Sequence, residues 1–174
     1  MTLPELAKIS VETYVKQGKI ISFPDNLPKE FLKKRAGVFV TIENQDHLRG
    51  CIGTYLPTQK NIAQELIQNA VSAATEDYRF GAILKEELPY LSYTVYILGK
   101  PEKVKNIKTL NPKKFGIILK THSLPPKCGL LLPDLEDVDR IEQQIQICCQ
   151  KGGIDQEKEK FVIFRFTVQK HGEK

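Results

Sequence analysis

The stretch GVFVTIENQDHLRGCIGT, residues 37–54, decides the fold predicted for this chain. Its first seven residues are rich in β-branched and aromatic side chains, which favour an extended backbone. A polar turn at 44–46 follows, and residues 47–54 return as a second run that Pro57 ends. Two such runs joined by a short polar turn predict a β-hairpin.

Amphipathic helices are predicted on both sides of this hairpin. Residues 3–17 follow a capping box of Thr2 and Glu5 and carry apolar side chains at helical spacing. Residues 60–77 hold the clearest apolar stripe of the chain. A third helix is predicted at 136–151, where a pair of glycines marks its end.

The remaining apolar runs predict further strands at 91–98, 115–119, 129–132 and 161–168. Helices and strands do not alternate strictly along the chain, so a doubly wound parallel sheet is a poor match. The order predicts an α+β fold in which helices flank an antiparallel or mixed sheet. Residues 1–174 are expected to form a single domain, and a division into two lobes stays open.

The composition is that of an ordinary globular protein, with 41% apolar and 27% charged residues among 174. No apolar run approaches the roughly 18 residues that a membrane span needs, and the first ten residues do not resemble a secretory signal. We therefore expect a cytoplasmic protein without a membrane partner. The net charge of +5 comes from scattered basic residues, so a solvated surface is favoured and nucleic acid is the least favoured partner.

The cysteines fall into two groups. Cys148 and Cys149 continue the apolar side of the last predicted helix and are expected to pack in the core. Cys51 differs because Gly50 and Gly53 flank it, and glycine weakens a strand. The two glycines predict a bulge, or the close approach of a ligand or another backbone. Cysteine and histidine residues lie too far apart in sequence for a local zinc site, so no metal is predicted.

Cys51 is the candidate nucleophile or ligand contact. On a regular strand Arg49 and Cys51 share one face, with Cα atoms about 6.6 Å apart, since each residue adds roughly 3.3 Å. A guanidinium beside a thiol favours the thiolate and lowers its pKa. A structural alternative stays open, in which Cys51 fills a space too small for a larger side chain. The sequence shows no partner base.

A second constellation, Glu76-Asp77-Tyr78-Arg79-Phe80, places two carboxylates at the end of the helix predicted at 60–77. The helix dipole disfavours a carboxylate there, so a cation is expected to offset it. One interpretation is an arginine–aspartate pair that joins the helix end to the hairpin. The other is a polar pocket that these charges form together with Arg49 and Cys51. The sequence leaves both open.

The motifs resemble, in order, those of the AMMECR family. They are LRGCIG at 48–53 after GVFVT at 37–41, NAVSAA at 69–74 before EDYRF at 76–80, GLLLP at 129–133 and FRF at 164–166. The resemblance runs from about residue 3 to 169 and implies an α+β fold with an antiparallel sheet and flanking helices. Three positions depart from the family: Tyr78 replaces a proline, residues 120–128 lack a glycine-rich basic turn, and Asp134-Leu135 replaces glutamine-valine.

Residue chemistry and resemblance together give one candidate site. Its members are Cys51 as nucleophile and Arg49, Gly50, Gly53, Asp77, Arg79 and Phe80 as ligand-binding residues. The resemblance associates this protein with Memo-type and radical SAM proteins, which implies a shared modification pathway, but it names neither reaction nor cofactor. The sequence leaves three functional hypotheses: a small-ligand protein or enzyme, a protein-binding adaptor, and a weak nucleic-acid-binding protein.

Overall fold

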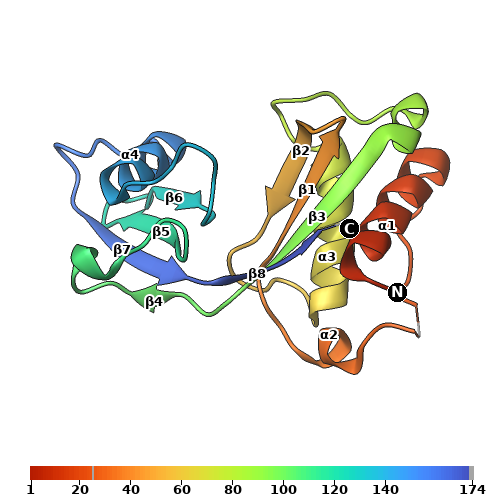
Figure 1. Ribbon diagram of the computed structural model, residues 1–174, viewed down its shortest axis with the longest axis horizontal. Coiled ribbons are helices and arrows are strands. Elements are labelled where there is room, and N and C mark those ends of the chain that lie inside the picture. Colours follow the sequence, from red (N-terminus) through yellow and green to blue (C-terminus); the bar gives the residue numbers. More distant parts are fainter. Residues whose placement is uncertain (25, 173–174) are drawn as a thin grey trace. The chain divides into compact units, whose positions relative to one another are not determined.

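The chain folds into two compact units, and the computed structural model describes residues 1–24 and 26–172. Unit 1 contains Met1–Leu98 and the residues from Gln169 onward, and unit 2 contains Gly99–Val168. Each unit has its own four-stranded sheet with helical cover (Figure 1). The predicted α+β class is therefore confirmed, with two sheets where one was expected.

Unit 1 has a sheet in the order β2-β1-β3-β8, in which β1 is antiparallel to β2 and to β3. Its elements are α1 (Leu3–Gln17), α2 (Lys29–Lys33), β1 (Val38–Asn44), β2 (His47–Gly53), α3 (Ile62–Thr75), the 3-10 helix η1 (Lys85–Tyr90), β3 (Leu91–Leu98) and β8 (Val168–Gly172). The predicted hairpin is confirmed as β1 and β2.

Unit 2 has a sheet in the order β4-β7-β5-β6, and its neighbouring strands pair antiparallel. Its elements are β4 (Glu102–Lys103), the 3-10 helix η2 (Ile107–Thr109), β5 (Gly116–Thr121), β6 (Cys128–Leu131), α4 (Ile141–Gly152) and β7 (Phe161–Phe166). The helix α4 packs on one face of this sheet, where Cys148 and Cys149 are buried among aliphatic side chains as predicted.

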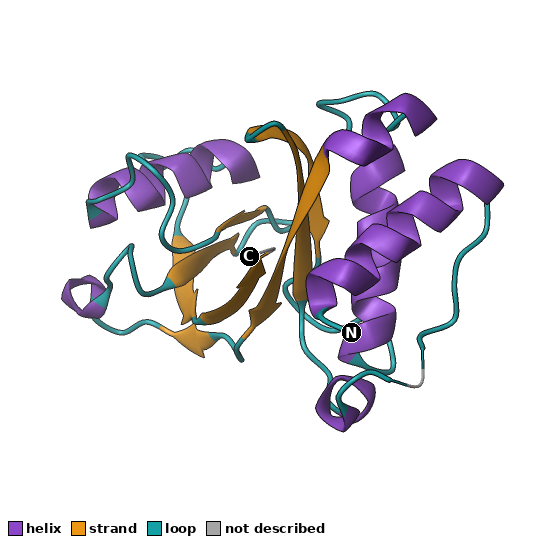
Figure 2. Cartoon of the chain, turned by 45° about the vertical axis from the view of Figure 1, so that its right-hand side comes forward, coloured by secondary structure: helices purple, strands orange, loops and turns teal. Residues whose placement is uncertain are grey.

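The core of unit 1 lies between one face of its sheet and the helices α1 and α3 (Figure 2). Val38, Val40 and Ile42 of β1 are fully buried on that face. Each such side chain contributes about 1.5–3 kcal/mol by leaving water. Because side chains alternate along a strand, Phe39 and Thr41 lie on the opposite face, which α1 and α3 do not cover.

The helices predicted at 60–77 and 136–151 and the strand predicted at 161–168 have wrong boundaries, and each has a local reason. The helix predicted at 60–77 spans only Ile62–Thr75, where Asn61 caps its start. The helix predicted at 136–151 begins five residues later, because Asp137 adopts a left-handed backbone conformation with φ 59° that no α-helix tolerates. The strand predicted at 161–168 ends at Phe166, and the chain then enters β8 of the other sheet.

The helix α1 shows how closely local chemistry fixes some boundaries. Glu5 and Thr2 form the predicted capping box, with side chain and backbone bonded in both directions. Gly18 ends the helix in the left-handed conformation at φ 69°. Across residues 1–24 and 26–172, no helix is both long and apolar enough to cross a lipid bilayer.

Candidate functional site

The motif strand β2 is an edge strand, and it is irregular at Arg49. Ile42 pairs with Gly50 and Glu43 pairs with Leu48, which leaves Arg49 as the extra residue of a β-bulge. A bulge re-aims the side chain that it carries. The regular-strand geometry expected for Arg49 and Cys51 therefore does not apply, because the bulge interrupts the alternation between them.

The guanidinium of Arg49 is bound by the segment that follows α3. Its Nε and Nη2 donate to the two carboxylate oxygens of Glu87 at 2.6 and 3.0 Å. Its Nη1 donates to the carbonyl oxygen of Gly81 at 2.9 Å, and Nη2 also reaches that of Ala82 at 3.3 Å. The Arg49 guanidinium holds the pKa of Glu87 below its usual range. Arg49 thus secures the 81–87 segment to the hairpin.

Cys51 is held through its backbone. Its amide donates to Asp77 Oδ2 at 2.8 Å, and its carbonyl oxygen accepts from Arg79 Nη2 at 3.5 Å. These are the outward-facing groups of an edge strand, which otherwise invite pairing with another strand. The thiol is half-buried, and its Sγ lies 3.3 Å from Oγ1 of Thr41, the cross-strand partner of Cys51.

Asp77 and Arg79 form the ion pair that makes this clamp. Arg79 donates from Nη2 to Asp77 Oδ2 at 2.7 Å and from Nε to Oδ1 at 3.0 Å. With the amide of Cys51 adding a further bond, the guanidinium of Arg79 lowers the pKa of Asp77 to about 2. Asp77 is buried, whereas the Arg79 side chain is 41% exposed and its guanidinium lies 5.3 Å from the ring centroid of Phe80.

The two glycines of the motif each allow a close approach. A Cβ on Gly50 would overlap the backbone carbonyl oxygen of Ala73 on α3. A Cβ on Gly53 would overlap the ring of Phe39 on the neighbouring strand. At these positions the approaching group is therefore a backbone and an aromatic ring of the chain itself.

The structure brings most of the predicted residues together in unit 1. Cys51, Asp77, Arg79 and Phe80 form one contiguous group, and Gly50 and Gly53 shape the strand that carries it. Arg49 adjoins this group in sequence, but its charge is directed to Glu87. Whether these residues bind a ligand stays a prediction.

Sequence reasoning missed two carboxylates that organise the surroundings. Glu87, three residues after Leu84, caps η1 by accepting from the Leu84 amide, but Leu84 has no polar side chain to complete a capping box, so the sequence carried no full signature. Glu65 is fully buried on α3 and accepts four hydrogen bonds from the 54–59 segment, two of them from the amides of Thr58 and Gln59. No local pattern signals that role, because its partners precede the helix in a loop.

Two further observations concern other parts of the chain. A surface pocket of about 270 Å³ lies elsewhere in unit 1, between residues 20–23 and the Gln64, Ile67 and Gln68 side of α3, and it includes none of the predicted site residues. In the described part of the chain, no three His, Cys, Asp or Glu side chains come together in a way that would hold a metal ion.

Fold and site together define a class: α+β proteins of two units with a cysteine clamped on an edge strand. The AMMECR1 family model matches residues 4–171, so the chain belongs to the AMMECR1 family. It is 45% identical over 162 residues to a protein of Thermotoga maritima, covering 92% of this chain and 91% of that protein. It is 40% identical over 170 residues to a protein of Clostridium acetobutylicum, covering 97% of this chain and 35% of that longer protein.

The fold has a solved counterpart. The crystal structure of an uncharacterized protein from Pyrococcus horikoshii superposes with a TM-score of 0.88 at 28% identity. The superposition covers 99% of this chain and 90% of that one. Both units therefore belong to the shared fold.

Proposed function

We propose that unit 1 binds a small ligand at Cys51, on the sheet face that α1 and α3 do not cover, with the Cys51 thiol as nucleophile or direct contact. The single observation that supports this proposal is the way Cys51 is held. Asp77 and Arg79 bind its backbone amide and carbonyl oxygen, while its side chain lies on the sheet face beside the Thr41 hydroxyl. A reactive side chain needs such a fixed backbone, because misplacement by a fraction of an ångström weakens catalysis and binding.

The surrounding groups suit a small polar ligand. Thr41 pairs with Cys51 on one side and with Thr94 on the other, so the Thr41 hydroxyl adjoins the thiol and Thr94 lies one strand further along the same sheet face. The guanidinium of Arg79 is paired with Asp77 on one side and is partly exposed at the strand edge. Hydroxyls supply both donors and acceptors, and a guanidinium favours a carboxylate or phosphate. We therefore expect an anionic or strongly polar ligand.

In this proposal Arg49 and Asp77 act mainly as positioning residues. Arg49 binds Glu87 and the carbonyl oxygens of Gly81 and Ala82, which leaves its guanidinium engaged within the protein. Asp77 is buried beneath Arg79. Cys51 and the exposed part of the Arg79 guanidinium are the groups that this proposal assigns to ligand contact. A pathway shared with Memo-type and radical SAM proteins stays a prediction of the family resemblance.

The alkylation rate of Cys51 tests the nucleophile role. The measurement uses iodoacetamide on the folded Cys128→Ser variant from pH 6 to 9, because Cys148 and Cys149 are buried and Cys51 is then the remaining accessible thiol. We expect rapid modification of Cys51 that is absent in Cys51→Ser/Cys128→Ser. A Cys51 thiol that stays unmodified in the folded protein up to pH 9 would overturn this role.

A non-catalytic adaptor is the second candidate, and exposed apolar side chains favour it. Tyr78, just before the 81–87 segment that Arg49 binds, is 95% exposed, and Leu84, within that segment, is 62% exposed. Anchored loops with exposed aromatic and aliphatic side chains are typical of protein-binding surfaces. Pull-down with the native chain and with Tyr78→Ser/Leu84→Ser tests this. An unchanged set of partners would count against this surface as the dock.

A further inference from the structure

Most of the excess positive charge of the chain belongs to unit 2. Residues 99–168 contain 13 lysines and arginines against 9 aspartates and glutamates, which is +4 of the total of +5. Five of the nine acids lie between positions 134 and 142, in and before the start of α4. The acidic side chains of unit 2 are therefore concentrated near the start of α4.

The pairing register defines the face that α4 does not cover, on which Ile118 is nevertheless buried and Lys120 and Phe164 are half-buried. Ile117 and Leu119 of β5 pack against α4, so Ile118 and Lys120 belong to the opposite face. Phe164 pairs with Ile118 on β5 and with Lys103 on β4, which places all three in one row across the sheet. Lys120, on the same face as this row, lies with its Nζ 5.9 Å from the ring centroid of Phe164.

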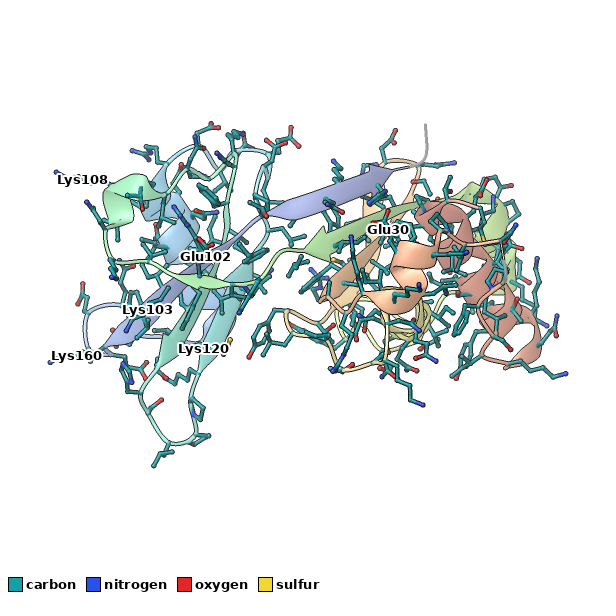
Figure 3. All side chains as sticks on the ribbon, turned by 90° about the horizontal axis from the view of Figure 1, so that it is seen from below. Glu30, Glu102, Lys103, Lys108, Lys120 and Lys160 are labelled. Carbon is teal, nitrogen blue, oxygen red and sulfur yellow. The ribbon has the colours of Figure 1, made fainter. Side chains whose placement is uncertain are left out.

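One aromatic ring is thus flanked by lysines from both neighbouring strands. Phe164 is half-buried on β7, Lys103 is exposed on β4, and Lys120 is half-buried on β5. Lys160, which immediately precedes β7, extends from the same end of unit 2 as these lysines (Figure 3). No acidic side chain within ion-pair distance is found for Lys103 or Lys160 among the described residues. Lys127, by contrast, pairs with Glu159 at 2.7 Å.

Aromatic rings among lysines on a sheet face match the chemistry of one ligand class. An unpaired base stacks on an aromatic ring, and the phosphodiester backbone takes the neighbouring cations. Stacking tolerates any base, because every base has a flat apolar face. Duplex nucleic acid offers no unstacked base to such a ring.

We infer that the face of the unit 2 sheet formed by Lys103, Lys120, Lys160 and Phe164 binds single-stranded nucleic acid, with Phe164 stacking on a base and the lysines contacting phosphates. This inference is independent of the site at Cys51, since it involves unit 2 alone. A lipid surface is less well matched. The large apolar side chains that unit 2 exposes within its described residues are Ile107 and Leu124, and neither lies on a strand of the sheet.

The test measures binding of a fluorescent 12-nucleotide oligothymidylate by anisotropy at salt concentrations from 50 to 300 mM. We expect binding at about 50 mM that weakens steeply with salt, because each phosphate contact contributes roughly 0.7 to the slope of log K against log salt for single strands. Lys103→Gln/Lys120→Gln is expected to weaken binding about tenfold and to lower this slope by about 1.4. Phe164→Leu is expected to weaken binding about fivefold or more with an unchanged slope.

A matched pair of lysines provides the control. Lys108→Gln/Lys151→Gln removes the same charge from η2 and from α4, so affinity is expected to change less than about twofold if the sheet face is the site. Thermal unfolding checks that each variant is folded. If Phe164→Leu unfolds, the affinity of the variant Lys103→Gln/Lys120→Gln still tests whether the sheet face binds the oligothymidylate. Two further probes are measured in the same way, a duplex of the same length and vesicles that contain anionic phosphatidylserine. The inference is overturned by no binding of the oligothymidylate at 50 mM salt or by an equal loss of affinity in both lysine pairs. Tighter binding of the duplex, or binding of the vesicles alone, also overturns it.

Discussion

The carboxylate of Asp77 accepts a 2.8 Å hydrogen bond from the backbone amide of Cys51, which ties the end of α3 to the edge of the unit 1 sheet. The two residues are 26 positions apart. The bond occupies an outward-facing amide that an edge strand would otherwise leave open. It also fixes the backbone from which the Cys51 thiol projects, so the stability of this clamp and the geometry of the site are linked.

Replacing Asp77 by Asn is expected to destabilise the protein by about 2 kcal/mol, because the pKa of Asp77 is lowered from 3.8 to about 2 and each pKa unit corresponds to about 1.36 kcal/mol. A carboxyl group with a lowered pKa stabilises the folded state above its unfolded pKa. This contribution is therefore complete above about pH 5 and is lost as the pH falls through 4 towards 2. Urea unfolding at pH 7 and at pH 3 measures both effects.

The exposed neighbour Glu76 is the control for Asp77. Glu76→Gln is expected to change the free energy of unfolding by less than about 0.5 kcal/mol, as is usual for surface positions. The difference between native protein and Asp77→Asn should shrink at pH 3, because the native carboxyl group becomes protonated there in the unfolded state. A difference that is equal at pH 7 and pH 3 would contradict the role of the ion pair.

Replacing Arg49 by Ala is expected to cost about 2–3 kcal/mol, since the partly buried Glu87 carboxylate and two carbonyl oxygens lose their donor together. Arg49→Lys should recover only part of this, because a lysine cannot bind Glu87 with two parallel bonds. Chemical denaturation measures these costs. Lys16→Ala, which breaks an exposed ion pair with Glu12, should cost under about 0.5 kcal/mol.

Replacing Gly50 by Ala is expected to destabilise unit 1 by about 3 kcal/mol or to prevent its folding, because the new Cβ would overlap the carbonyl oxygen of Ala73 on α3. Neither backbone can move without disturbing the core on both sides. Gly81→Ala is the matched control, since nothing lies within 4 Å of a Cβ built there. Similar melting temperatures for Gly50→Ala and Gly81→Ala would refute this close approach.

The cysteines of the folded protein should divide into two classes under alkylation at pH 8. Cys148 is fully buried, and burial raises its pKa to about 12, so it is expected to stay unmodified together with Cys149 until the protein unfolds. Cys51 and Cys128 should be modified, with Cys128 slowed because neighbouring atoms partly desolvate its surface thiol and raise its pKa. Mass spectrometry after timed iodoacetamide treatment measures the order in which the cysteines are alkylated. Early modification of Cys148 would show that α4 opens readily.

Local sequence signals predicted most elements well. Thr2 and Glu5 determine the start of α1 without help from the rest of the chain, because their capping box involves adjacent residues only. The late start of α4 was missed, because aspartate rarely adopts the left-handed conformation that Asp137 has. The break at Thr167 between β7 and β8 was missed as well, since an apolar run does not reveal that its halves join different sheets.

The candidate site also has features that the sequence predicted and features that it did not. The residue types of the LRGCIG motif and of the Asp77-Arg79 pair marked the right part of the chain, and an arginine–aspartate pair at the end of α3 was one of two interpretations left open. The partner of Arg49 was not predictable, because Glu87 is 38 residues away and the β-bulge turns the guanidinium towards it. Glu65 was hidden for the same reason, as it serves a loop rather than its own helix.

The sequence by itself determined which residues could form helices and strands, that the hairpin at 37–54 carries the cysteine, and that two glycines there indicate a bulge or a close neighbour. These properties follow from local backbone preferences and from the period of apolar side chains. Only the tertiary structure decided that the neighbours are Ala73 and Phe39, that Arg49 serves Glu87, and that Arg79 reaches Cys51. The hydrogen-bond partner of a side chain depends on which donors and acceptors the packed core brings within about 3 Å of each other. The separation of two residues along the sequence does not reveal this distance.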